Sequence, residues 1–142
     1  MLRKLFGATV VGIVLCVGLF VGPAHAIETM TGKSRDVSKA PPGGLSCADG
    51  RAIGVLVCFE PYGDKFWIKD TLADGHHVAV SFATGRGEIG SCHNYHGKAA
   101  GWTLCDQFAK HISEHETINF IGLTMEGSKI LAQTKNAWAG TT

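Results

Sequence analysis

The chain has 142 residues, 45% of them hydrophobic, and its formal net charge is +1 at neutral pH. This length and composition indicate a single globular domain. Because no basic run or patch is visible, the charge argues against a general nucleic-acid binder or a protein that binds anionic membranes.

The N-terminus has the pattern of a secretory signal peptide. The basic residues Arg3 and Lys4 precede an apolar run over residues 5–21. The small residues Ala24 and Ala26 then stand where signal peptidase requires them. We therefore predict that residues 1–26 are a cleaved signal peptide, that the mature protein is secreted, and that no membrane segment remains after cleavage.

The mature chain divides into a leader and one domain. Residues 27–45 are polar, rich in Lys, Ser, Thr, Gly and Pro, and show no hydrophobic periodicity, which predicts a flexible leader or short pro-segment. Residues 46–142 carry the regular patterns and form the predicted domain. We expect this domain to be a monomer.

Residues 46–142 contain a series of short predicted strands separated by turns. Val55, Val57 and Phe59 alternate with residues of the opposite face, and Val78, Val80 and Phe82 do the same, which is the period of a half-buried strand. The predicted strands cover residues 53–59, 65–69, 76–84, a short stretch ending at 92, 102–106, 116–125 and 129–133, with residues 139–142 frayed. Six or seven short strands predict an all-β fold, a small antiparallel sandwich or barrel.

Four cysteines follow the signal peptide, namely Cys47, Cys58, Cys92 and Cys105. An even number of cysteines in an exported chain predicts disulfide bonds. Three pairings are possible, and the sequence alone does not choose among them. We favour Cys92 with Cys105 and Cys47 with Cys58, because each pair closes a short loop and stabilises a domain whose core is small.

Part of the chain resembles a group of small, uncharacterised exported proteins from high-GC Gram-positive bacteria. The resemblance covers residues 51–125 and rests on the run from Cys58 to Asp70, Asp74-Gly75 with the Val-Ala-Val strand that follows, Cys92-His93-Asn94, Gly97 and Cys105. It implies a compact β-sandwich and a bond between Cys92 and Cys105. Members often have a further cysteine near position 122, which is Gly122 here, so Cys47 is the candidate to replace it as the partner of Cys58. The resemblance implies no activity.

One stretch of the sequence concentrates metal-ligating side chains. His93, His96 and Asp106 are ligand types that zinc accepts, and copper also accepts imidazoles. A zinc or copper site formed by these three residues is one hypothesis. The alternative is that the region holds no metal, because the His-x-x-His spacing is short and lies on a predicted loop, and the nearby cysteines are a dozen residues apart and are expected to be bonded to each other. We expect no cofactor.

Acid–base catalysis is a second hypothesis for the same region. His93 and His96 have side chains that titrate near neutral pH, and Arg86 and Glu88 lie a few residues before them. Together the four could form a small secreted hydrolase of the phosphodiesterase kind. Proximity in the sequence does not place these side chains around one point, however, and no serine-nucleophile motif is present.

Binding without catalysis is the leading hypothesis. Tyr62, Trp67, Tyr95 and Trp102 are candidate exposed aromatic residues, which commonly anchor protein interfaces and sugar faces. The alternative for the two tryptophans is that they belong to the core. We expect an interaction or inhibitor module that binds a protein or glycan, and no nucleic acid, through loops at one end of the fold, namely 60–64, 85–90 and 93–101.

Overall fold

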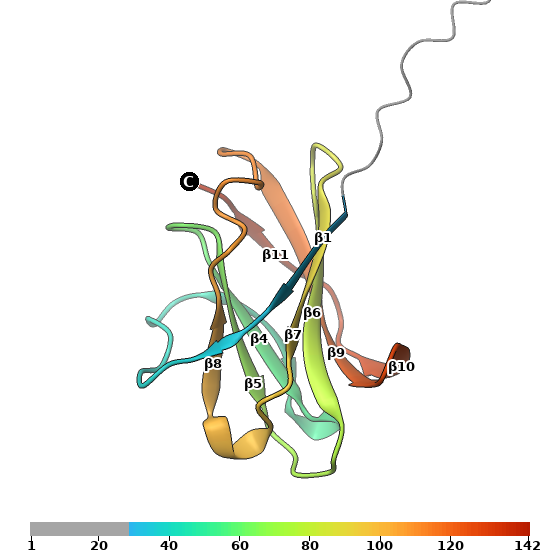
Figure 1. The fold of residues 1–142 in the computed structure, drawn as a ribbon. Coiled ribbons are helices and arrows are strands. Elements are labelled where there is room, and N and C mark those ends of the chain that lie inside the picture. The colour runs from blue at the N-terminus through green and yellow to red at the C-terminus, as the bar shows by residue number, and fades with distance from the viewer. Residues whose placement is uncertain (1–28) are drawn as a thin grey trace, which may run out of the picture.

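The computed structural model describes residues 29–142, so the predicted signal peptide lies outside the described residues. The described chain is all-β, as predicted, with eleven strands and two short 3₁₀ turns (Figure 1). The elements in order are β1 (Thr29–Lys33), β2 (Arg35–Asp36), β3 (Ser46–Gly50), η1 (Arg51–Ile53), β4 (Val55–Glu60), β5 (Lys65–Asp70), β6 (His77–Thr84), β7 (Ile89–Asn94), η2 (Lys98–Ala100), β8 (Trp102–Cys105), β9 (Thr117–Glu126), β10 (Lys129–Gln133) and β11 (Ala137–Gly140).

The strands form two sheets that pack face to face as a sandwich. The first sheet, sheet A, has the order β1-β7-β6-β9-β10, and β11 also pairs with β9. The second, sheet B, has the order β2-β8-β5-β4-β3. Almost every neighbouring pair is antiparallel, and β1 with β7 is the parallel exception. The predicted sandwich is therefore confirmed, and the two sheets do not close into a barrel.

The core lies between the two sheets and follows the alternation in the sequence. Val55, Val57 and Phe59 of β4 are fully buried there, as are Val78 and Val80 of β6. Five phenylalanines from both sheets and the 106–116 loop contact one another at its centre, namely Phe59, Phe66, Phe82, Phe108 and Phe120. The inward positions predicted for these two strands are confirmed.

Both favoured disulfides are present. Cys92 on β7 bonds to Cys105 on β8, so this bridge joins sheet A to sheet B inside the core. Cys47 on β3 bonds to Cys58 directly opposite on β4, on the outer face of sheet B. The first bridge therefore connects the two layers, whereas the second connects neighbours within one layer.

The predicted flexible leader is wrong for residues 29–36. Strand β1 pairs with β7 in sheet A, and the chain then crosses to pair β2 with β8 in sheet B (Figure 1). Only Met30 and Gly32 of β1 face inward, and a side chain at Gly32 would collide with Gln107 and approach Phe108. Backbone pairing with a free strand edge holds this segment, and such pairing leaves no hydrophobic pattern in the sequence.

The C-terminus is also ordered rather than frayed. Strand β11 pairs with β9, and Ser46 of β3 donates a hydrogen bond to the Trp138 carbonyl. Thr141 is buried, and its hydroxyl donates to the Ser113 carbonyl and accepts from the Glu116 amide. Strands β1, β2, β3 and β11 account for the difference between the predicted six or seven strands and the eleven observed. Each is short and is held mainly through its neighbours.

Candidate functional site

The three loops predicted to form one binding end lie at opposite ends of the sandwich. The register pairs Ala83 with Ile89 at one end of β6 and β7 and Val78 with Asn94 at the other. Residues 60–64 and 85–88 therefore lie at the upper end in Figure 1, with the 106–116 loop, while residues 95–101 lie at the lower end. The expectation of a single loop-built binding end is wrong, because β7 runs the length of the sheet between the second loop and the third.

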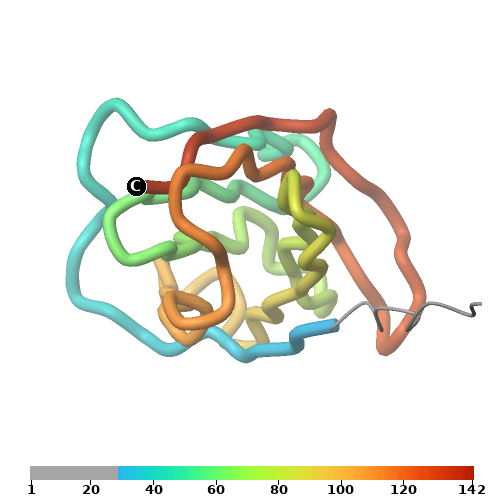
Figure 2. Tube along the Cα trace, turned by 90° about the horizontal axis from the view of Figure 1, so that it is seen from above, coloured from blue at the N-terminus to red at the C-terminus, as the bar shows by residue number. Residues whose placement is uncertain are grey.

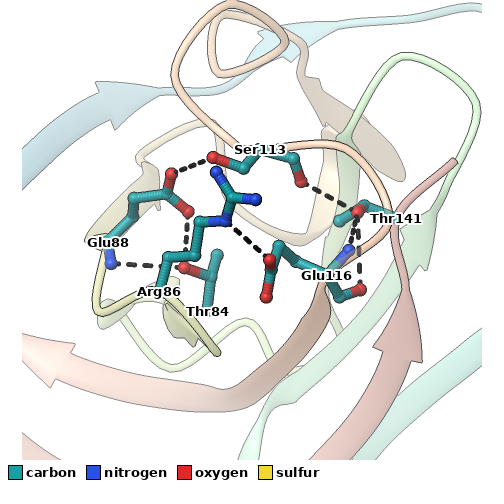
Figure 3. Close-up of polar contacts among 6 residues, drawn as sticks. All are labelled: Thr84, Arg86, Glu88, Ser113, Glu116 and Thr141. Atoms are coloured by element: carbon teal, nitrogen blue, oxygen red, sulfur yellow. Dashed lines mark hydrogen bonds and ion pairs between the residues drawn. The ribbon is translucent and has the colours of Figure 1, made fainter.

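The same geometry separates the residues of the catalytic hypothesis. Glu88 comes directly before β7 and His93 lies near the far end of that strand, about 17 Å away over five residues of extended chain. Arg86 and Glu88 instead join a polar network at the upper end (Figure 3). The four residues proposed as a hydrolase site do not converge on one point.

The upper network binds the 106–116 loop and the C-terminal residues to the sandwich (Figure 3). Glu88 accepts hydrogen bonds from the hydroxyls of Ser113 (2.6 Å) and Thr84, and Arg86 donates to Glu116 at 2.7 Å. Burial of Glu88 acts to raise its pKa, but these hydrogen bonds outweigh it and hold the pKa below its usual value. Glu88 is thus a satisfied acceptor with a structural role.

Asp64 is a buried carboxyl beside this network. It is 1% exposed, adopts a left-handed φ of 47° in the β4–β5 turn, and its Oδ1 atom has no hydrogen-bond partner among the described residues. Burial, and then the negative charges of Glu114 and Glu88, raise its pKa from 3.8 to about 6. The folded state therefore favours the neutral carboxyl.

We expect Asp64→Asn to remove one pH dependence of stability. Because the folded pKa is raised, the contribution of Asp64 to stability is full below about pH 4 and is lost as the pH rises through about 6. The variant keeps a neutral side chain that tolerates the left-handed conformation. Urea unfolding should show it more stable than the wild type at pH 7, on the order of 1–2 kcal/mol, with no gain at pH 4. An equal gain for Asp64→Asn at both pH values would contradict the assignment.

Two histidines and a tyrosine form a cluster on the outer face of sheet A. The Nε2 atom of His77 is 3.2 Å from the Nδ1 atom of His93, and the Tyr95 ring stacks on both imidazoles. Burial, and then the neighbouring His93, lower the pKa of His77, and burial lowers that of His93. Both imidazoles are therefore neutral at pH 7. The sequence singled out His93 but not His77, which only the register of β6 against β7 brings beside it.

The other two residues of the metal hypothesis lie elsewhere. The His96 ring contacts the Ser34 carbonyl at 2.9 Å and the Asp36 carboxylate at 3.0 Å, and Asp106 forms an ion pair with Arg35 at 2.5 Å. Within residues 29–142, no group of three or more His, Cys, Asp or Glu side chains is arranged to hold a metal ion. The set His93, His96 and Asp106 therefore does not form a site.

The four aromatic candidates divide between core and surface. Tyr62 and Tyr95 are exposed, as expected for loop residues, at 80% and 57%. Trp67 is 2% exposed and packs with Cys58 and Leu104 on the outer face of sheet B, and Trp102 is half-buried beside them. For Trp67 the core alternative is therefore the correct one. Trp138 on β11 is 57% exposed and was not among the aromatic candidates.

A cleft of about 820 Å³ lies on the outer face of sheet B. The segment that forms one wall, residues 37–45, bows away from the body of the sandwich in Figure 2 and is called the strap below. Trp67 and Leu104 form the floor, with Val37 of the strap packed against them. Charged side chains of both signs form the remaining walls, namely Arg35, Asp36, Lys39, Glu60, Lys65 and Asp106.

The charged walls of the cleft are held in place by one another. Glu60 accepts a hydrogen bond from the Trp67 indole N–H at 2.8 Å and pairs with Lys65 at 3.2 Å. The strap is anchored at one end by pairing of β2 with β8 and at the other by β3 and the Cys47–Cys58 disulfide. The cleft is therefore preformed, and its walls are restrained on both sides.

Two further observations bear on function. In the described part of the chain, no helix is long and apolar enough to cross a membrane. Comparison with known proteins finds no matching protein family, no matching curated protein and no matching solved structure.

Proposed function

We propose that the protein is a secreted, non-enzymatic binding module that holds a polypeptide segment of a partner protein in the cleft beneath the strap. The signal-peptide pattern and the two disulfides support secretion, because disulfides persist in oxidising compartments. The separation of Arg86 and Glu88 from the histidines supports binding rather than catalysis by that set.

The preformed cleft is the observation that carries this proposal. Its volume lies within the range of ligand sites, roughly 300–1,000 Å³. The strap is fixed at both ends before any ligand arrives, so binding does not have to order it. The Cys47–Cys58 disulfide contributes to this arrangement, because it anchors the strap that forms one wall of the cleft.

The chemistry of the walls favours a polypeptide as the ligand. The floor is apolar, and the walls present three cationic and three anionic side chains. A nucleic acid or another polyanion would meet repulsion from Asp36, Glu60 and Asp106. A peptide carrying apolar side chains and charges of both signs can match such a mixed surface. A neutral glycan, from the other expected ligand class, lacks the charged groups that these walls complement.

Selection from a random peptide library displayed on phage, against the oxidised and tag-free protein, tests the proposal. We expect selected peptides to bind the wild type and to lose at least tenfold in affinity against Ala40→Trp, which fills the cleft from an exposed strap position. Lys39→Glu should weaken the binding of peptides that carry an acidic residue. The matched control Lys110→Glu, on an exposed residue outside the cleft lining, should bind as the wild type does.

Three results would overturn the proposal. The first is that no peptide is selected, and the second is that the selected peptides bind the cleft variants as tightly as the wild type. The third is turnover of RNA, peptidoglycan or peptide by the pure protein that is lost in His93→Ala or His96→Ala, which would establish the hydrolase alternative.

A further inference from the structure

We propose that His77 and His93 form a copper-binding site on the outer face of sheet A, with Cu²⁺ held between the Nε2 atom of His77 and the Nδ1 atom of His93. This face belongs to the other sheet from the cleft, so the inference does not depend on the proposed function. It also differs from the metal set suggested by the sequence, because it replaces His96 and Asp106 with His77.

The separation of the two ring nitrogens suits a shared metal ion. They face each other at 3.2 Å. Metal–imidazole bonds are about 2.0–2.1 Å long, so two nitrogens on one four-coordinate ion lie about 2.8–3.4 Å apart, depending on whether the angle is square or tetrahedral. The same 3.2 Å is at the long limit for a hydrogen bond between the rings. A metal ion can replace that contact once His77 carries its proton on Nδ1 instead of Nε2, and once both rings turn so that their lone pairs meet at a point beside the line that joins the two nitrogens.

The strand register explains why the two rings meet. Ala79 on β6 lies directly opposite His93 on β7, which makes His77 the diagonal neighbour of His93 on the same face. The small side chain of Ala79 leaves the space between them open to the rings. Tyr95 stacks on both imidazoles, with ring centroids 4.5 Å from His77 and 5.8 Å from His93, and restrains their orientation.

The second nitrogen of His93 has the partner expected of a metal ligand. Histidines that bind a metal through one ring nitrogen usually donate a hydrogen bond from the other. The Nε2 atom of His93 faces the Ser91 hydroxyl at 3.4 Å, two residues along the same strand. With the proton on Nε2 directed at Ser91, the Nδ1 lone pair of His93 points toward His77.

The nature of the ligands selects copper over zinc. Two imidazoles with water in the remaining positions follow the general order of divalent affinities, in which Cu²⁺ exceeds Zn²⁺. Lys33 pairs with His93 in the β1–β7 register, and its ammonium group lies over the Tyr95 ring at 5.7 Å. Its positive charge weakens the binding of any cation at the site. We therefore expect Lys33→Gln to bind copper more tightly than the wild type.

Titration of the tag-free, metal-stripped, oxidised protein with CuCl₂ in a non-coordinating buffer tests the site. We expect one equivalent of Cu²⁺ to bind, with nitrogen hyperfine structure in the electron paramagnetic resonance spectrum and an affinity at least tenfold higher than for ZnCl₂. His77→Ala and His93→Ala should each lose at least tenfold in Cu²⁺ affinity. Ser91→Ala should lose severalfold, because its role is to orient the ring of His93.

Matched variants keep the result interpretable. His77→Phe and His93→Phe retain a ring to stack on Tyr95, so they preserve the fold if an alanine variant does not. His96→Ala and His111→Ala remove histidines outside the site and should bind copper as the wild type does. The proposal is overturned if the wild type takes up no Cu²⁺, if zinc binds more tightly, or if His96→Ala loses as much affinity as His77→Ala.

Discussion

Removal of the Cys92–Cys105 disulfide by a double substitution to alanine should destabilise the domain by about 4–5 kcal/mol. The chain-entropy model assigns about 3 kcal/mol to a loop of this size, since the two cysteines are 13 residues apart. Both cysteines are fully buried in the core, so the lost sulfur atoms add about 1–2 kcal/mol of cavity cost. A small domain has about 5–15 kcal/mol in total, so urea unfolding should show a much lower midpoint.

The second disulfide supplies the matched control. Cys47 and Cys58 are 11 residues apart, so the chain-entropy contribution is similar, at about 3 kcal/mol. This bridge lies on the outer face, however, and the β3–β4 ladder still joins the two strands without it. We expect the double alanine variant to lose about 2–3 kcal/mol. A loss equal to that of the core bridge would contradict the importance we assign to the link between sheets.

Phe66→Ala should destabilise the domain by about 3–5 kcal/mol, the usual cost of truncating a buried phenylalanine. Phe66 is fully buried on β5 at the centre of the aromatic core. Its ring lies 4.9 Å from both Phe59 and Phe82, 5.7 Å from Phe120 and 6.5 Å from Phe108. Because these neighbours come from both sheets and the 106–116 loop, the cavity cannot be filled by one local movement. Thermal and urea unfolding of the oxidised protein measure the loss.

Tyr62→Ala is the control for the core substitution. Tyr62 lies four residues earlier in the same hairpin but is 80% exposed, and the Lys65 ammonium group lies over its ring at 5.5 Å. The variant should change stability by less than about 0.5 kcal/mol. If Tyr62→Ala and Phe66→Ala lower the free energy of unfolding equally, the buried phenylalanine cluster is not the main source of packing stability.

A clear two-residue period in the sequence predicted two of the central strands together with their inward faces. Val55, Val57 and Phe59 on β4 face the core, and so do Val78 and Val80 on β6. Strands β1 and β3 escaped prediction because each buries little and is held by its neighbour's backbone. A pattern of side chains reports burial, whereas a short edge strand depends mainly on hydrogen bonds to a partner.

The candidate sites depended still more on the tertiary structure. His93 was a sequence candidate, but its partner His77 lies sixteen residues away on the adjoining strand. Arg86 and Glu88 are close to His93 in the chain, yet β7 is extended and carries them to the other end of the sheet. The cleft combines the strap with β5 and β8, which are far apart in the sequence.

The sequence by itself thus determined the fold class, the inward face of the main strands and the set of cysteines available for pairing. These follow from local alternation and composition, which act over a few residues. The tertiary structure alone decided which polar side chains meet, because strand register places residues from distant parts of the chain side by side. It therefore separated His93 from Glu88, brought His77 to His93, and turned the expected flexible leader into two strands and the strap of a cleft.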